Sequence, residues 1–141
     1  MLYLLHPAVI HFPIAFLLLN GALTLWHLRR ADAFVERSAY GALVFGWWGA
    51  LVATASGLLA VAVTWPLEDA HIAWINAHAV LAALVLFVYG RALLLRRRDP
   101  GVLHGAQRRT YLLLVLAGAL LVATSGWTGG HLVYQLGFGV R

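Results

Sequence analysis

The chain contains no cysteine, which excludes structural disulfides, thiolate metal sites and a covalently attached c-type haem. Charge is scarce as well, because only 11% of the 141 residues are charged and five of them are acidic. No phosphate-binding or dinucleotide-binding glycine pattern follows a strand. No nucleophile stands beside a base, and no carboxylate pair lies within an apolar run. These absences argue against a nucleotide-binding enzyme and against a hydrolase.

What the chain has in abundance is apolar surface: 62% of its residues are hydrophobic and its mean hydropathy is +0.83. A soluble domain of this size cannot bury so much, so we expect lipid as the solvent. Crossing about 30 Å of hydrocarbon takes roughly 20 residues of helix, and the chain has four runs near or above that length. They are Pro7 to Leu28, Ala39 to Val63, Ile72 to Leu95 and Thr110 to Trp127. Short connections favour an all-α membrane protein, a four-transmembrane-helix up-down bundle forming a single transmembrane domain over residues 1–141.

The basic residues lie on one side of this predicted topology. Nine of the ten arginines lie between runs one and two, near the end of run three, or between runs three and four. Arginine-rich loops are cytoplasmic in most membrane proteins, so we predict a multi-pass protein of the bacterial inner (cell) membrane with both termini outside. The same placement argues against nucleic acid as a partner, since that would need a basic face on a soluble surface.

Two stretches of the chain read alike. His11 and His78 each open an apolar run and each lies nineteen residues before an arginine. The following segments also match, as 51-LVATASG-57 and 121-LVATSG-126. The offset of 67 to 71 residues predicts two parallel two-helix repeats, approximately 1–70 and 71–141, with His11 and His78 at equal depth facing one axis.

Five of the seven histidines map to the predicted outer end, namely His6, His11, His71, His78 and His131. Ionisable side chains in spanning segments are costly and mark functional sites. Imidazole suits zinc, copper and iron, and haem iron takes two axial histidines in many membrane cytochromes. The axes of diagonal helices in a bundle lie roughly 11–14 Å apart. Two histidines that reach inward from such helices can hold a flat macrocycle between them, but they do not converge on a bare ion without a third ligand.

The sequence therefore predicts His11 and His78 as axial metal ligands, with Gly57 and Gly126 leaving room for a flat cofactor at their depth. We expect His6 and His71, together with His131, to meet the propionates, a bound quinol or a docking partner. Pro7 suggests that His6 caps the first helix rather than facing inward. We expect the remaining two histidines, His27 and His104, to be ordinary solvated side chains at the cytoplasmic end.

A resemblance supports the topology. The segment 6-HPAVIHFPI-14, with the late 129-GGHLVY-134 and 137-GFGV-140, resembles a bacterial membrane family catalogued as domain of unknown function 2231. The resemblance covers nearly the whole chain and implies four membrane helices without an assigned activity; a similarity of context to redox carriers is a hint only. The family tail continues from its tyrosine into a histidine position that Leu136 occupies here, so no role for that histidine transfers.

The leading hypothesis is a small membrane b-type cytochrome, with one haem b ligated by two histidines near the outer leaflet. It would carry electrons to or from a periplasmic redox partner or a quinone, as an electron-transfer subunit rather than a stand-alone enzyme. One alternative is a non-redox scaffold or assembly subunit of a larger membrane complex. Another is an outer-side copper or zinc site using His6, His11, His71 and His131.

Overall fold

The computed structural model describes residues 5–139, and these form helices and their connections, with no strand among them. A short α1 (Leu5–Val9) leads into α2 (His11–Arg30), and the two together make one apolar span. The other spans are α3 (Ala33–Thr64), α4 (Asp69–Arg98) and α5 (Arg108–Tyr134). All four spans are long and apolar enough to cross a membrane, which confirms the all-α, four-helix prediction.

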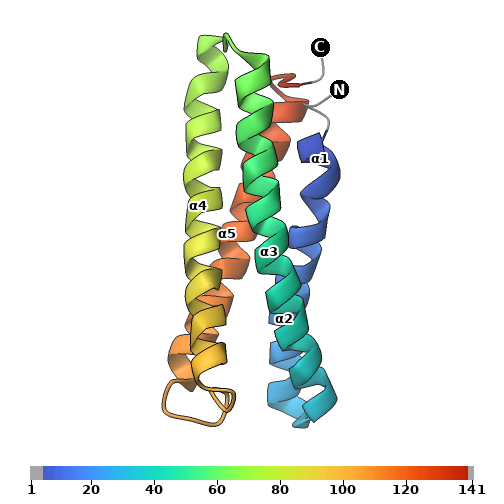
Figure 1. The fold of residues 1–141 in the computed structure, drawn as a ribbon, viewed down its shortest axis with the longest axis vertical. Coiled ribbons are helices and arrows are strands. Elements are labelled where there is room, and N and C mark those ends of the chain that lie inside the picture. The colour runs from blue at the N-terminus through green and yellow to red at the C-terminus, as the bar shows by residue number, and fades with distance from the viewer. Residues whose placement is uncertain (1–4, 140–141) are drawn as a thin grey trace.

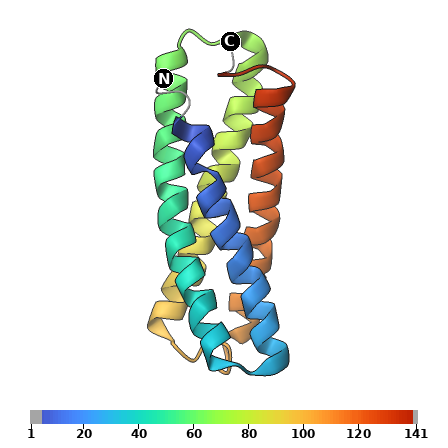
Figure 2. The same ribbon diagram turned by 90° about the vertical axis from the view of Figure 1, so that its right-hand side faces the viewer.

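The spans run up and down in an elongated bundle (Figures 1 and 2). The α2–α3 turn and the α4–α5 loop lie at one end, which we call the arginine end because nine of the ten arginines flank these connections. The α3–α4 turn, α1 and the last turns of α5 lie at the opposite end, which we call the histidine end. The closest-packed pairs are α2 with α3 and α4 with α5, so the bundle consists of two helical hairpins.

Glycine lets the helices approach closely in the middle of the bundle. The Tyr89 ring is fully buried, its hydroxyl donates to the Leu17 carbonyl at 3.2 Å, and it lies directly against Gly118. A Cβ at position 118 would come within 2.6 Å of that ring, and a Cβ at Gly46 within 2.6 Å of the Leu17 side chain. Membrane helices are held by such close packing, because lipid gives no hydrophobic drive between them.

The outer faces of the helices remain apolar. Phe87 is 67% exposed, Leu120 is 62% exposed and Leu58 is 64% exposed, each within a different helix. A water-soluble bundle would place polar side chains at such positions. The exposed apolar faces therefore fit a protein whose helices contact lipid.

The last helix is longer than the sequence suggested. The predicted run ends at Trp127, whereas α5 continues through Gly129 and Gly130 to Tyr134. Glycine is tolerated in membrane helices, where every backbone group needs a partner within the helix. Residues 129–134 are therefore helical, and a short tail follows Tyr134, of which Val140 and Arg141 lie outside the described residues. The first part of this tail covers the histidine end, because the Leu136 carbonyl accepts a hydrogen bond from His71 Nε2 at 3.1 Å.

Candidate functional site

Two histidines from different halves of the chain meet at the histidine end. His6 lies on α1 and His78 lies on α4, and their ring centroids are 6.2 Å apart with the ring planes at 81°. Both side chains are partly buried. His6 was expected to cap the first helix, but its ring lies against α3 instead, since α1 packs along that helix.

The His6 ring is held on α3 through its Nδ1 atom. Nδ1 lies 2.9 Å from the Ala53 carbonyl oxygen and 3.1 Å from Ser56 Oγ. The Ser56 hydroxyl donates its own hydrogen to the Ala53 carbonyl at 2.7 Å. Neither oxygen therefore has a hydrogen to offer the ring, so Nδ1–H is the donor. In a neutral imidazole this leaves Nε2 with a free lone pair.

His78 is held on α5 in the same way. Its Nδ1 lies 3.1 Å from Thr128 Oγ1, and the Thr128 hydroxyl donates to the Ser125 carbonyl at 2.9 Å. Nδ1–H is again the donor, and Nε2 again keeps a lone pair. Both imidazoles are thus fixed in one tautomer, and Nε2 of each has no hydrogen-bond partner among residues 5–139.

A glycine lies beside each ring. A Cβ added at Gly57 would come within 3.0 Å of His6 Cε1, and a Cβ added at Gly129 within 3.0 Å of His78 Cε1. Contacts that short are tighter than normal van der Waals packing, so any larger residue would push the ring away. Glycine is therefore what allows each imidazole to lie close to its neighbouring helix.

These two arrangements correspond residue by residue. His6, Ala53, Ser56 and Gly57 match His78, Ser125, Thr128 and Gly129, and each pair is 72 positions apart. The sequence comparison used offsets of 67 to 71 and so paired His11 with His78 and Gly57 with Gly126. The shared contacts are local, and the duplication of the whole halves stays a prediction.

The structure does not bring His11 and Gly126 into this site. His11 is exposed, and its Nδ1 bonds the Pro7 carbonyl one turn earlier at 3.0 Å. Five residues separate it from His6, which on a helix turns the side chain to another face. Gly126 is also exposed, and a Cβ there would meet nothing within 4 Å.

The other histidines of this end make different contacts. His71 is buried beneath the tail, where its ring lies 5.5 Å from that of Phe138. The His131 ring stacks on Trp74, with centroids 4.1 Å apart. Both rings help to close the end of the bundle.

Sequence reasoning missed Ser56, Thr128 and Gly129. A signal for them exists: 53-ATASG-57 and 125-SGWTG-129 share a small residue, a hydroxyl three positions later and then a glycine. At an offset of 72, residues 53–57 align with residues 125–129 and His6 aligns with His78. The LVAT segments are more nearly identical and align at an offset of 70, so they predicted a different pairing of the two halves.

At the arginine end, one expectation was wrong. His27 was predicted to be solvated, but it is 4% exposed, because the last turn of α2 packs against the start of α3 and the α4–α5 loop covers it. His104 in that loop is exposed, as expected.

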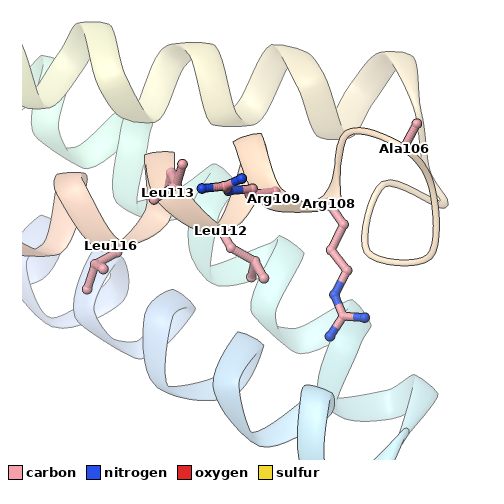
Figure 3. Close-up of a pocket in the computed structure, with 6 residues that line it drawn as sticks. All are labelled: Ala106, Arg108, Arg109, Leu112, Leu113 and Leu116. Carbon is pink, nitrogen blue, oxygen red and sulfur yellow. The ribbon is translucent and has the colours of Figure 1, made fainter.

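A shallow groove also lies at the arginine end (Figure 3). It is lined by Ala106, Arg108, Arg109, Leu112, Leu113 and Leu116, all from the end of the α4–α5 loop and the first turns of α5. It contains no histidine, and it is separated from the His6–His78 pair by most of the length of α5. It therefore takes no part in the candidate site.

Comparison with known proteins supports the fold and leaves the chemistry open. No curated protein and no solved structure matches the chain. A family model described as "Predicted membrane protein (DUF2231)" matches residues 4–141, almost the entire sequence. The chain therefore belongs to this family of four-helix membrane proteins.

Proposed function

We propose that the protein is a small membrane b-type cytochrome, in which His6 and His78 hold one haem b and pass electrons to or from a redox partner or a quinone. One observation carries the proposal: two neighbouring imidazoles each donate Nδ1–H to the protein, and within residues 5–139 neither Nε2 has a hydrogen-bond partner. Metal-binding histidines commonly have this arrangement, because the second hydrogen bond orients the ring and makes the ligating nitrogen more basic.

The spacing of the rings supports a shared metal. An imidazole nitrogen binds a first-row metal at about 2.0–2.1 Å, and the ring centre lies about 1 Å further away. Rings that held one metal ion between them would have centroids about 6 Å apart, and those of His6 and His78 are 6.2 Å apart.

The shortage of further ligands favours haem over a bare ion. Zinc and copper sites generally use three protein ligands or more, whereas haem iron is commonly held by two histidines. Within residues 5–139, the one cluster of three His, Cys, Asp or Glu donors lies at the arginine end. The His6–His78 pair matches the number of ligands that haem needs.

The surrounding residues have defined roles in this proposal. When bound, haem supplies one-electron chemistry. Ser56 and Thr128 keep each proton on Nδ1, and Gly57 and Gly129 let the rings lie close to α3 and α5. Because the ligands come from α1 and α4, the cofactor would join the two helical hairpins.

The arginine distribution supports an orientation as well. With nine arginines beside the cytoplasmic loops, the protein would lie in the bacterial inner membrane with both termini, and the His6–His78 pair, on the outer side. An outer-side protein or a quinone in the outer leaflet would then exchange electrons with it.

A difference spectrum tests the function. The full chain is purified in detergent, supplied with haem, and its reduced-minus-oxidised spectrum is recorded. A sharp α band with one haem per chain is the expected result, and its absence would contradict the proposal. Elemental analysis separates the alternatives. Stoichiometric copper or zinc without haem would support a metal site. A protein that contains neither haem nor metal would support a scaffold subunit.

A further inference from the structure

A second cluster of metal-binding side chains lies at the arginine end, remote from the His6–His78 pair. His27 is in the last turn of α2, Glu36 is in the first turn of α3, and His104 is in the α4–α5 loop. One ligand atom from each lies within 4.8 Å of the others. Three separate segments of the chain therefore converge on one point.

The tautomer of His27 is fixed by its surroundings. Its Nδ1 lies 2.8 Å from the Asp32 carbonyl, which can only accept, so Nδ1–H is the donor. Nε2 of the neutral ring then carries a lone pair. This atom lies 3.8 Å from Glu36 Oε2, too far for a hydrogen bond. With the ring neutral, two electron-pair donors lie next to each other in a nearly buried position, an arrangement that a cation between them would stabilise.

The width of this gap suits a metal ion. Zinc binds histidine nitrogen and carboxylate oxygen at about 2.0–2.2 Å, so its ligand atoms lie roughly 3.3–3.6 Å from one another in a tetrahedral site. The 3.8 Å between His27 Nε2 and Glu36 Oε2 is slightly wider, so a small side-chain rotation would bring both atoms onto one ion.

Glu36 is held in place from its other side. Its Oε1 accepts a hydrogen bond from Arg96 at 2.7 Å, and the side chains of both residues are largely buried. This contact orients the carboxylate and leaves Oε2 3.8 Å from His27 Nε2. The α2–α3 turn is fixed too, because Asp32 caps α3 by accepting hydrogen bonds from Phe34 and Val35. Both ligands are therefore oriented before any ion binds.

The third ligand is presented by an anchored loop. Val102 and Leu103 are 0% and 3% exposed and tie the α4–α5 loop to the core. The adjacent His104 is exposed, and its ring centroid lies 5.7 Å from that of His27. A small movement of this one solvent-facing side chain would complete the site.

We propose that His27, Glu36 and His104 bind one Zn²⁺ ion, with water as the fourth ligand. Two imidazoles and one carboxylate favour zinc over calcium or magnesium, which prefer oxygen ligands throughout. The ion joins the α4–α5 loop to the α2–α3 turn. It is independent of the proposed haem, because the two sites share no residue and lie at opposite ends of the bundle.

Calorimetry on the full chain in detergent tests the site, after the protein has been stripped of metal with a chelator. Titration with Zn²⁺ should show one saturable site per chain. His104→Gln should weaken binding at least about tenfold without unfolding the protein, because this side chain is exposed. His131→Gln is the matched control, since it removes a histidine of the opposite end, and His6→Ala should also leave the affinity unchanged.

A second measurement follows the loop itself. Zn²⁺ should slow amide hydrogen exchange in residues 99–107 of the unaltered chain and have no such effect in His104→Gln. Either of two results would overturn the proposal: no saturable Zn²⁺ binding, or equal affinities for His104→Gln and His131→Gln. A fall in affinity in His6→Ala alone would assign the ion to the histidine end and would also contradict it.

Discussion

His6 and His78 lie next to each other with their ring centroids 6.2 Å apart and their ring planes at 81°, although 72 positions separate them in the sequence. Each ring is bonded through Nδ1 to the helix beside it, His6 to α3 and His78 to α5. The pair thus connects the two helical hairpins of the bundle, and it is the basis of the haem proposal.

The first prediction concerns the identity of the ligands. His6→Ala and His78→Ala should each abolish the α band of the haem-supplied protein, because bis-histidine ligation needs both rings. His11→Ala should retain it, since that side chain is exposed and bonded only to Pro7 in its own turn. Visible spectra of the three variants, purified side by side, measure this. If His11→Ala lost the band and His6→Ala kept it, the ligands would be His11 and His78, as the sequence predicted.

The second prediction concerns the glycines beside the rings. Gly57→Ala or Gly129→Ala would place a Cβ 3.0 Å from an imidazole carbon, so the ring must move. Such overpacking costs about 1–3 kcal/mol, and we expect haem affinity to fall about tenfold or more. Haem titration measures the change. Gly126→Ala is the control, because its Cβ would meet nothing within 4 Å; an equal loss there would show that steric contact with the ring is not the cause.

The third prediction concerns the hydroxyl that orients His78. Thr128→Val keeps the shape of the side chain but removes the acceptor of Nδ1–H, so haem affinity should fall about 10–100-fold and the reduction potential should shift. Thr128→Ser keeps the acceptor and should restore both values. Redox titration together with haem titration checks this. If valine and serine behave alike, the 3.1 Å contact does not orient the ligand.

The fourth prediction concerns stability. Gly118→Ala would bring a Cβ within 2.6 Å of the fully buried Tyr89 ring, so the ring or the helix must shift. We expect the free energy of unfolding to fall by about 1–3 kcal/mol. Denaturant unfolding in detergent measures it. Gly41→Ala has nothing within 4 Å of the new Cβ and should stabilise α3 slightly through helix propensity; the opposite ranking would contradict the packing described here.

The fifth prediction concerns orientation. Gln107 lies in the arginine-end connection and Gln135 follows α5 at the histidine end, and both are exposed. Since the chain has no cysteine, Gln107→Cys and Gln135→Cys each introduce one unique label site. A membrane-impermeant thiol reagent added to intact cells should modify position 135 and spare position 107. Labelling of position 107 alone would invert the orientation and place the His6–His78 pair on the cytoplasmic side.

The sequence alone was sufficient for the number of helices and for the distribution of residue types between the two ends. Length, hydropathy and the position of the arginines are local properties of each segment, so they can be read from the sequence without knowing how the helices pack. Predicted and observed helices differ mainly at their ends, as at α5, which extends beyond Trp127 to Tyr134. The sequence becomes glycine-rich after Trp127, but the helix continues, because backbone groups in lipid have no water to bond and must find partners within the helix.

Only the tertiary structure decided which histidines meet. In lipid, a helix is apolar on nearly every side, so its sequence hardly reveals which face points inward. Here that rotation follows from close packing, with Gly46 against Leu17 and Gly118 against Tyr89. It turns His6 toward His78 and leaves His11 exposed, and at the other end it buries His27 beside Glu36. Hydropathy and charge therefore determine how this chain crosses the membrane, whereas contacts between residues far apart in the sequence determine where its chemistry can lie.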